Sequence, residues 1–417
     1  MAKAHLTNAK NTKNDEFYTQ YPDIQNEIEA YLEYDPDTFR DKVVYCNCDD
    51  PFESNFFKYF VLNFKRLGLK RLITTSYKPS PIANTQLALI GEDKIIEPQK
   101  GREKPTANKF IINEVGDTDN DGGFSLSDIA KQLQENKNNE WTPLEGDGDF
   151  RSPECVELLK QSDIVVTNPP FSLFREYVAQ LIEHNKKFAI IGNMNAITYK
   201  EIFPLIKENK MWLGKGFKRS CAHFFSPFKS ESKWLEEEQF MKKGIEIPKG
   251  LFVTRVAGIH WFTNIDHGRR HQSLSLMTRA DNEKFNKKIQ KSDTAYKHYD
   301  NYDAIEVPFT DAIPSDYDGV MGVPISFLDK HSPEQFDIIG MAQRSCHDNL
   351  PDTKKYDTYV QMTGDGDIEG SNGRKINEAP IIEGRLDGKT YYADNNGREV
   401  VSLYMRIFIR HKKGVTS

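Results

Sequence analysis

The sequence predicts an α/β protein, with a three-layer domain followed by a β-rich region, and three observations support this prediction. From Asp41 to about Gly214, short apolar runs alternate with segments of helical spacing, which is typical of a largely parallel sheet with helices on both faces. From Lys215 onward, short strands and turns replace this pattern. At 417 residues, the chain is also too long for one typical hydrophobic core. We therefore expect three parts with these limits: 1–40, 41–214 and 215–417.

The bulk composition predicts a globular protein of the cytoplasm. Hydrophobic residues make up 38% of the chain and charged residues 28%. We find no apolar run of the roughly 18 residues that a membrane span needs, and the first residues lack the apolar core of a secretory signal. The five cysteines are odd in number and scattered, and Cys46-x-Cys48 has the wrong spacing for a zinc half-site. We expect reduced thiols, no membrane contact and no bound metal.

The N-terminal segment is polar up to Asn14 and then carries aromatic side chains. Phe17, Tyr18 and Thr19 precede a segment of helical spacing from Ile24 to Tyr34. Aromatic residues ahead of a helix can pack onto it as a hydrophobic staple, or they can line a ligand pocket. The sequence leaves both interpretations open.

The first strand of the α/β domain is predicted at Asp41–Cys46, and a polar turn at 47–55 leads from it into a helix at Phe56–Leu67. The turn holds carboxylates and small polar side chains but no glycine. It departs from the glycine-rich fingerprint that cradles a pyrophosphate, and it better suits a cofactor with a positive charge and no phosphates. A second strand, Arg71–Thr75, brings Ser76 to the same edge of the sheet.

Residues 78–148 are less regular. Short apolar pieces at Lys94–Ile96 and Lys109–Ile112 predict an inserted hairpin. Asp117–Asp128 begins like a calcium loop, D-x-D-x-D-G, but it ends in Asp where Glu is usual, and a strand precedes it where a helix is expected. We favour a polar surface loop there and leave a calcium site open.

Asp149 and Phe150 come directly before a predicted helix, Pro153–Gln161, and a predicted strand, Asp163–Thr167. Ligands of open α/β sheets bind along the carboxyl edge of the strands. These two side chains are therefore candidates for ligand contacts.

The turn after that strand is Asn168-Pro-Pro-Phe171, and a helix is predicted after it, from Ser172 to His184. The two prolines fix φ and remove two backbone donors, so the Asn168 side-chain oxygen and the Pro169 carbonyl remain as acceptors beside an aromatic ring. Such a turn can hold a planar group by an exocyclic NH2 and stack on its face. The alternative is a simple strand-ending turn, because Asn-Pro is ordinary turn chemistry.

The acceptor turn suits methyl transfer to an aromatic amine. Such an amine is a poor nucleophile because its lone pair is delocalised into the ring. Hydrogen bonds from both N–H groups to Asn168 and Pro169 favour a pyramidal nitrogen with an available lone pair. In-line attack on a sulfonium methyl group then depends mainly on positioning. A base in a duplex reaches such a turn only when it is flipped out, and Phe171 would then stack on it.

The region after Lys215 is predicted to be a mixed β-rich region. Strands are predicted at Leu251–Thr254, Ile259–Thr263, Phe336–Gly340, Tyr391–Tyr392 and Val400–Ile409, and a polar helix at Asn282–Ile289. The net charge of −6 does not indicate a nucleic-acid binder, but a local basic face can coexist with an acidic remainder. Candidate phosphate contacts in basic clusters are Lys215, Lys218, Arg219, Arg269 and Arg270. A solvated face is the alternative for each cluster.

Together these motifs resemble a known family. Asn168-Pro-Pro-Phe171 is similar to motif IV of the S-adenosylmethionine-dependent amino-methyltransferases. Taken with Asn14–Thr19, Cys46–Phe56 and Gly148–Ser152, it resembles the EcoRI-type adenine-specific DNA methyltransferases, and the resemblance continues to Gly340.

The resemblance implies a Rossmann-like methyltransferase sandwich with a C-terminal target-recognition region. It implies methyl transfer from S-adenosylmethionine to N6 of a flipped-out adenine in double-stranded DNA, with a separately encoded restriction endonuclease as a possible partner and no obligatory protein partner. The catalytic residues that it implies are Asn168, Pro169, Pro170 and Phe171. The cofactor-binding residues that it implies are Phe17, Tyr18, Thr19, Asn47, Cys48, Asp49, Asp50, Pro51, Ser54, Ser76, Asp149 and Phe150. The first loop departs from the family pattern because it lacks F-x-G-x-G.

Other functions stay open on the residues alone. The same turn serves methyl transfer to cytosine N4 in DNA, to adenine in RNA or to a glutamine amide in a protein. The basic clusters favour a nucleic acid, and the family resemblance favours adenine in DNA. A catalytically silent nucleic-acid-binding or calcium-regulated module would require the motif to be idle.

Overall fold

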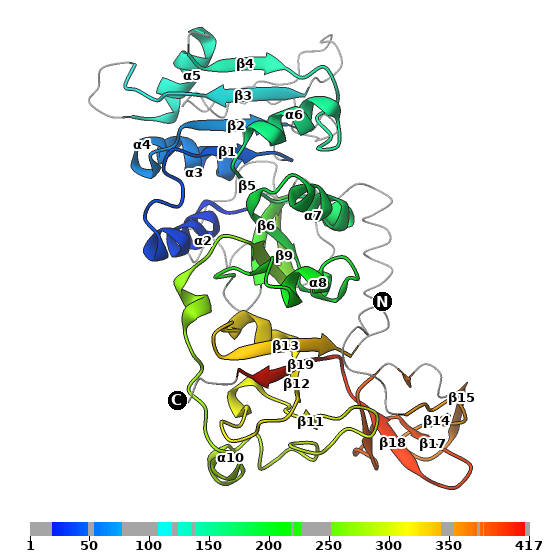
Figure 1. The fold of residues 1–417 in the computed structure, drawn as a ribbon. Helices are drawn as coiled ribbons and strands as arrows, with labels where there is room; N and C mark the ends of the chain where they lie inside the picture. Colours follow the sequence, from blue (N-terminus) through cyan, green and yellow to red (C-terminus); the bar gives the residue numbers. More distant parts are fainter. Residues whose placement is uncertain are drawn as a thin grey trace. The chain divides into compact units, whose positions relative to one another are not determined.

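The structure is a computed structural model, and it describes these residues: 19–48, 54–76, 107–118, 124–135, 138–217, 221–226, 252–342, 354–372, 376–377 and 379–412. The chain forms two compact units (Figure 1). Unit 1 consists of Met1–Ala196 and Met211–Gly268, and unit 2 of Ile197–Lys210 and Arg269–Ser417.

Unit 1 is built on a mixed sheet whose eight described strands follow the order β4-β3-β2-β1-β5-β6-β10-β7. Figure 1 labels the strands from β4 to β6 of this order. The central strands are parallel: β2 (Arg71–Thr75), β1 (Val43–Cys46), β5 (Ile164–Thr167) and β6 (Lys187–Asn193). The outer strands are antiparallel to their neighbours: β3 (Asn108–Ile112), β4 (Glu140–Pro143), β10 (Ile259–Thr263) and β7 (Trp212–Leu213). Because β1 leads to β2 on one side and β5 leads to β6 on the other, the winding of the chain reverses between β1 and β5.

Helices cover both faces of this sheet. The α-helices of unit 1 in the described residues are α2 (Tyr21–Tyr34), α3 (Asn55–Leu62), α4 (Phe64–Leu67), α5 (Leu126–Glu135), α6 (Pro153–Gln161) and α7 (Phe174–Glu183), with a short 3-10 turn, η1 (Phe171–Leu173), before α7. One core cluster joins α2 and α3 to alternate strand residues such as Val44, Val166 and Trp261. On the opposite face, Phe174 of α7 packs edge-on against Phe262 of β10. The predicted three-layer α/β fold is therefore confirmed.

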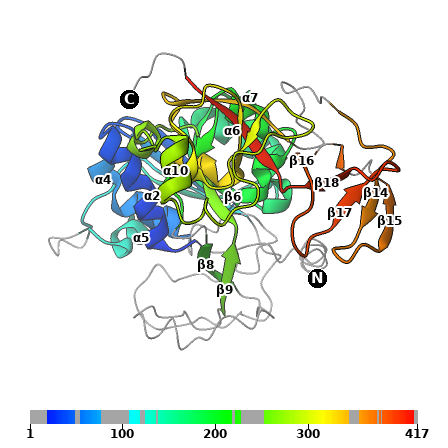
Figure 2. The same ribbon diagram turned by 90° about the horizontal axis from the view of Figure 1, so that it is seen from below.

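The hairpin β8 (Cys221–Ser226) and β9 (Phe252–Ala257) is an antiparallel pair in unit 1 (Figure 2). Its strands flank residues 227–251, which lie outside the described residues.

Unit 2 is β-rich, as predicted. One sheet has the order β11-β12-β19-β13: β11 (Ile305–Glu306), β12 (Met321–Pro324), β19 (Arg406–His411) and β13 (Phe336–Met341). A second has the order β15-β14-β17-β18-β16: β15 (Ile368–Asn372), β14 (Val360–Met362), β17 (Tyr391–Ala393), β18 (Glu399–Ser402) and β16 (Ile381–Glu383). Its helical elements are α8 (Phe203–Lys207), η4 (Gly268–His271, which starts at the last residue of unit 1), α10 (Arg279–Phe285), η5 (Thr310–Ala312) and η6 (Ile325–Lys330), and η2 (Met194–Thr198) spans the first boundary between the units.

Three predicted elements differ from the structure. The single strand expected at Val400–Ile409 is two strands in different sheets, β18 and β19, with the exposed Tyr404 between them. The helix expected at Asn282–Ile289 is α10, which begins earlier because the Thr278 side chain caps it by accepting a hydrogen bond from the Asp281 amide at 3.1 Å. The helix expected at Phe56–Leu67 is interrupted at Asn63 and forms α3 and α4.

Two expectations concern limits along the chain. One strand of the predicted hairpin, Lys94–Ile96, lies outside the described residues. The other, Lys109–Ile112, is part of β3, which pairs with β2 and β4. The expected limit at residue 214 falls inside unit 1, because β10 returns to the first sheet and pairs with β6. The functional parts at 1–40, 41–214 and 215–417 stay a prediction.

Candidate functional site

The predicted site residues gather where β1, β2 and β5 end. Asn47 follows β1, Ser76 follows β2 and Asn168 follows β5, and these parallel strands end at one edge of the sheet. The reversal between β1 and β5 lies at the middle of this edge, and such reversal points are where open α/β sheets bind ligands. The Thr167 hydroxyl of β5 donates a hydrogen bond to the Asn47 carbonyl, so the two strand ends are directly linked there.

The turn after β1 has a backbone conformation that is unusual for its residues. Asn47 is buried, and its side-chain oxygen accepts a hydrogen bond from the Tyr177 hydroxyl. Cys48 has φ of 71°, in the left-handed region that glycine enters without steric cost. The turn contains no glycine, and Cys48 takes the left-handed conformation instead. The other predicted residues of this turn, Asp49, Asp50 and Pro51, lie outside the described residues.

Thr19 and Ser54 meet at the start of α3. Ser54 is the N-cap of this helix, and its side chain accepts hydrogen bonds from the amides of Phe56 and Phe57 at 3.1 and 3.4 Å. The Asn55 side-chain amide donates to the Thr19 carbonyl at 2.7 Å. The Thr19 hydroxyl is buried, and within the described chain it has no hydrogen-bond partner.

The other two aromatic candidates of the N-terminal segment, Phe17 and Tyr18, lie outside the described residues. Their two interpretations, a staple or a pocket wall, therefore both stay predictions.

Gly148 brings the Asp149–Phe150 loop against the end of β2. Gly148 has φ of 79°, and a Cβ atom at this residue would lie 1.9 Å from the Ser76 carbonyl oxygen. Only glycine allows this approach, because the Cβ atom of any other residue would clash with the Ser76 carbonyl oxygen. Ser76 is itself fixed, since its hydroxyl accepts a hydrogen bond from the Asn108 amide at 2.8 Å.

Asp149 is held by its neighbour Arg151. Its carboxylate accepts hydrogen bonds from the Arg151 amide at 2.8 Å and from the Arg151 guanidinium at 2.9 and 2.7 Å. Hydrogen bonds from Arg151 hold the pKa of Asp149 below its ordinary value, so this carboxylate is ionised at neutral pH. The Phe150 ring is buried and lies edge-on to the Tyr177 ring, with the centroids 4.9 Å apart.

The Asn168-Pro-Pro-Phe171 turn is rigid and largely buried. Asn168 and Pro169 are buried, whereas Pro170 and Phe171 are partly exposed. The Pro170 carbonyl accepts a hydrogen bond from the Leu173 amide at 3.0 Å, which starts η1 and then α7. Phe171 packs at the margin of the unit 1 core and keeps part of its surface open. The turn therefore combines a fixed backbone with one partly exposed aromatic face.

The candidate phosphate contacts divide between the two units. Lys215 in unit 1 is partly exposed, and its backbone amide donates to the Glu27 carboxylate at 3.0 Å. In unit 2, Arg269 forms an ion pair with Asp329 at 2.6 Å, and Arg270 is buried with its guanidinium donating to Asn209. Lys218 and Arg219 lie outside the described residues.

Burial gives Arg270 a packing role in unit 2. This side chain is not exposed to a phosphate in the described structure, so the predicted DNA contact of Arg270 stays untested.

Asp128, the last residue of the possible calcium loop, lies in the first turn of α5 and binds the residues that precede this helix. Its two oxygens accept hydrogen bonds from the amides and hydroxyls of Thr118 and Ser125, at 2.7 to 2.9 Å. The bond from the Ser125 amide to the Asp128 side chain is one half of a capping box at the start of α5. The hydrogen bonds of Thr118 lower the pKa of Asp128. Residues 119–123 of the loop lie outside the described residues, so calcium binding stays untested.

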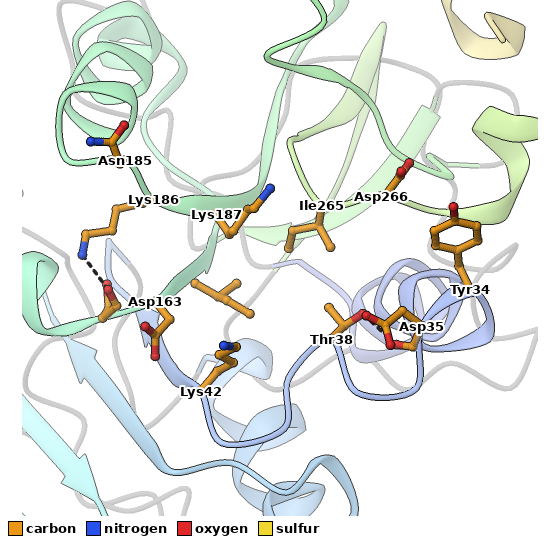
Figure 3. Close-up of a pocket in the computed structure, with 12 residues that line it drawn as sticks. Tyr34, Asp35, Thr38, Lys42, Asp163, Asn185, Lys186, Lys187, Ile265 and Asp266 are labelled. Atoms are coloured by element: carbon orange, nitrogen blue, oxygen red, sulfur yellow. Dashed lines mark hydrogen bonds between the residues drawn. The ribbon is translucent and has the colours of Figure 1, made fainter. Parts of the chain in front are cut away.

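A cavity of about 490 Å³ lies at the opposite edge of the same sheet (Figure 3). Lys42, Asp163 and Lys187 line it near the starts of β1, β5 and β6. The Lys186 ammonium donates to the carbonyls of Lys160 and Ser162 at 2.9 and 2.6 Å, so it fastens the loops before β5 and β6. The wall holds both acidic and basic side chains, and we assign no ligand to this cavity.

Three residues that the sequence did not single out shape the site. Tyr177 contacts two of its loops, Gly148 sets the approach to β2, and Glu27 holds the segment around Lys215. Gly148 lies in the Gly148–Ser152 stretch that resembles the family, so the sequence pointed to its surroundings. Tyr177 and Glu27 occupy buried positions on the amphipathic helices α7 and α2, and nothing in the sequence set them apart from other buried helix residues.

None of the helices in the described part of the chain is long and apolar enough to span a membrane.

A family model described as adenine-specific methyltransferase EcoRI matches residues 5–412. The chain is 44% identical over 339 residues to the type II methyltransferase M.EcoRI of Escherichia coli, which covers 80% of this chain and 88% of that protein. It is 34% identical over 385 residues to the type II methyltransferase M.MpnI of Mycoplasma pneumoniae, covering 91% and 98%. It is 33% identical over 386 residues to the type II methyltransferase M.MgeORF184P of Mycoplasma genitalium, again covering 91% and 98%. No solved structure matches the chain.

Proposed function

The chain belongs to the EcoRI-type family of adenine-specific methyltransferases, and on that premise we propose the residues through which it methylates adenine N6 in DNA. The observation that supports this proposal best is the link between the ends of β1 and β5. The Thr167 hydroxyl, next to the Asn168 turn, donates to the carbonyl of Asn47. The two halves of a two-substrate site therefore lie side by side at the reversal point of the sheet.

The methyl acceptor is assigned to the Asn168-Pro-Pro-Phe171 turn. The Asn168 side-chain oxygen and the Pro169 carbonyl accept hydrogen bonds from the exocyclic amine of a flipped-out adenine. These fixed acceptors favour the pyramidal nitrogen that attacks, and they need no reorganisation because two prolines hold the backbone. Phe171, which keeps part of its ring surface exposed, stacks on the base. Attack is in line, so no cysteine nucleophile is required.

The methyl donor is assigned to S-adenosylmethionine, which when bound supplies a methyl group on a positively charged sulfonium. The residues present fit this cofactor. The buried Thr19 hydroxyl has no hydrogen-bond partner within the described chain and is available to a ligand. Asp149 is ionised, which suits a cationic cofactor, and Phe150 gives an apolar wall.

The remaining cofactor contacts follow from the family motifs. Asn47, Cys48, Ser54 and Ser76 lie at the same edge of the sheet as Thr19 and Asp149. In this assignment Ser54 acts partly through the start of α3, because its hydroxyl caps that helix. Residues outside the described parts complete the proposed set: Phe17, Tyr18, Asp49, Asp50 and Pro51.

The substrate is double-stranded DNA, and the proposed phosphate contacts are Lys215, Lys218, Arg219 and Arg269. The relatives are named type II methyltransferases. We therefore place the reaction in restriction–modification in the cytoplasm, with a separately encoded endonuclease that cuts the same target when it is unmethylated.

Transfer of a labelled methyl group to DNA, followed by digestion to nucleosides, tests this function. The wild-type chain is expected to yield N6-methyldeoxyadenosine. Asn168→Ala is expected to bind the cofactor normally in calorimetry and to lose about 100- to 1,000-fold in turnover, as removal of a placed hydrogen-bond partner does elsewhere. Asn168→Asp keeps an acceptor oxygen and is expected to retain more activity than Asn168→Ala.

Two outcomes would contradict the proposal. Label found only in N4-methyldeoxycytidine, or in no nucleoside, would overturn the adenine assignment. Full turnover in Asn168→Ala would remove Asn168 from the catalytic turn.

A further inference from the structure

One helix contacts both loops that are proposed to hold the cofactor. Helix α7 starts directly after the Asn168-Pro-Pro-Phe171 turn, and η1 joins the two without a break. Tyr177, in the first turns of α7, is fully buried. Its hydroxyl donates to the Asn47 side-chain oxygen, and its ring lies edge-on to the Phe150 ring. A single side chain thus touches the loop after β1 and the loop before α6.

Two neighbours of Tyr177 hold the second loop as well. The Gln180 side-chain amide donates to the Phe150 carbonyl at 3.2 Å. Glu176 forms an ion pair with Arg151 at 2.9 Å, and Arg151 in turn holds the Asp149 carboxylate. The ion pair is exposed and contributes little by itself. The buried ring of Tyr177 and the partly buried hydrogen bond of Gln180 therefore fix the position of the Phe150 ring and backbone.

The hydrogen bond from Tyr177 also decides what the Asn47 amide can do. An asparagine side chain has one oxygen acceptor and one NH2 with two donors. Burial raises the pKa of the Tyr177 hydroxyl well above its ordinary value, so this hydroxyl stays a donor at any physiological pH. Tyr177 occupies one lone pair of the Asn47 oxygen and turns this oxygen toward itself, so the donors that Asn47 can offer to a ligand are those of its NH2 group.

We propose that Tyr177 is a positioning residue for the methyl donor, which sets the orientation of the Asn47 amide and of the Phe150 ring. This inference rests on the proposed function, because it assigns Asn47 and Phe150 to the cofactor. Tyr177 does not touch the reacting atoms. It acts through the two residues that it holds, and its helix starts at the turn that holds the adenine. Cofactor affinity is therefore tied to the placement of the catalytic turn.

Tyr177→Phe tests the inference, because it removes only the hydroxyl and keeps the ring beside Phe150. The dissociation constant of S-adenosylmethionine, measured by calorimetry without DNA, is expected to rise about three- to tenfold, which corresponds to one lost hydrogen bond. The KM for the cofactor is expected to rise by the same factor. The kcat at saturating cofactor and the KM for DNA are expected to change less than about twofold.

Tyr31→Phe is the matched control. Tyr31 is also fully buried in unit 1, and its hydroxyl donates to the Glu27 carboxylate at 2.6 Å. This variant is expected to lower the melting temperature at least as much as Tyr177→Phe and to leave the cofactor affinity unchanged. A loss of affinity in both variants would mean that Tyr177 matters only for folding, and would overturn the inference.

A double-mutant cycle asks whether Tyr177 acts through Asn47. Asn47→Ala is expected to weaken cofactor binding, and the further change of Tyr177 to Phe is expected to add nothing. Additive losses would contradict the proposed route. The two proposals also fail differently. Absence of methyl transfer in the wild type would refute the proposed function, whereas an active wild type with unchanged cofactor affinity in Tyr177→Phe would refute this inference alone.

Discussion

At the scale of single residues, Cys48 shows how the chain makes a tight turn without glycine. Its φ of 71° costs about 1 kcal/mol or more for a residue with a Cβ atom. Glycine avoids that cost but gains backbone freedom in the unfolded chain. Cys48→Gly is therefore expected to keep the free energy of unfolding within about 1 kcal/mol of wild type. Cys48→Val is expected to lower it by about 1–2 kcal/mol, because branching at Cβ adds strain at positive φ.

Cys46→Val is the control for this prediction. Cys46 lies two residues earlier, buried in β1, where extended backbone favours a branched side chain. Urea unfolding of the three variants compares the same substitution in two conformations. If Cys48→Val were as stable as Cys46→Val, the left-handed conformation of Cys48 would be in doubt.

At the scale of elements, the sequence predicts best where a segment is determined locally. Strands β2 and β10 and helix α6 have the limits that were predicted for them. Both strands are almost fully buried, and α6 begins at a proline directly after Ser152, whose hydroxyl accepts from the Cys155 amide at 3.3 Å. The motif residues at the ends of β1 and β5 were predictable for the same reason.

The contacts that assemble the site were not predictable from local patterns. Tyr177 and Asn47 are 130 residues apart in the sequence, and Lys215 and Glu27 are 188 apart. Helical spacing in the sequence predicts that a side chain faces the core. The partner of that side chain depends on which strands become neighbours in the sheet. Such pairs therefore need the tertiary structure.

Glu27 gives an element-scale prediction. This buried carboxylate on α2 accepts hydrogen bonds from the Tyr31 hydroxyl and from the amides of Lys215 and Gly216, at 2.6 to 3.0 Å. Glu27→Gln removes one acceptor oxygen and leaves a buried donor without a partner. The free energy of unfolding, measured in urea, is expected to fall by about 1–3 kcal/mol.

Glu29→Gln is the control on the same helix. Glu29 pairs with Arg66 at 2.6 Å, and both side chains are partly exposed to water. Its loss is expected to cost less than about 1 kcal/mol. Equal losses in the two variants would contradict the role assigned to Glu27 in holding the 214–216 segment.

At the scale of the whole molecule, the two units are interleaved along the chain. Residues 197–210 belong to unit 2, although the segments on either side belong to unit 1. Dividing the chain by its sequence pattern assumes that each domain is one continuous segment. The sequence could therefore predict a change of pattern near Lys215, but not that residues 197–210 belong to unit 2 and residues 211–268 to unit 1. The β-rich character of the second part was predictable, since it follows from its short strands and turns.

The two-unit organisation leads to a pH prediction for unit 2. His331 packs on the Phe327 ring, and its Nε2 atom lies 3.1 Å from the Phe336 carbonyl oxygen. Burial lowers the pKa of His331 from 6.5 to about 4. Between these values the unfolded chain binds a proton that the folded chain does not, so the free energy of unfolding decreases as the pH falls from 6.5 to 4. One pKa unit corresponds to about 1.4 kcal/mol, which gives a loss of about 3 kcal/mol from this residue.

His331→Gln removes the titrating group and keeps a donor for the Phe336 carbonyl. Urea unfolding at a series of pH values is expected to show a decrease toward pH 4 that is about 3 kcal/mol smaller in the variant than in wild type. His298→Gln, at an exposed histidine of the same unit, is expected to keep the wild-type profile. Hydrogen exchange of peptides from β13 and β19 locates the effect, because the His331 ring contacts the carbonyl of Phe336, the first residue of β13. Acid should loosen these strands before those of unit 1. Parallel pH profiles for wild type and His331→Gln would show that His331 is protonated in the folded chain as readily as in the unfolded one.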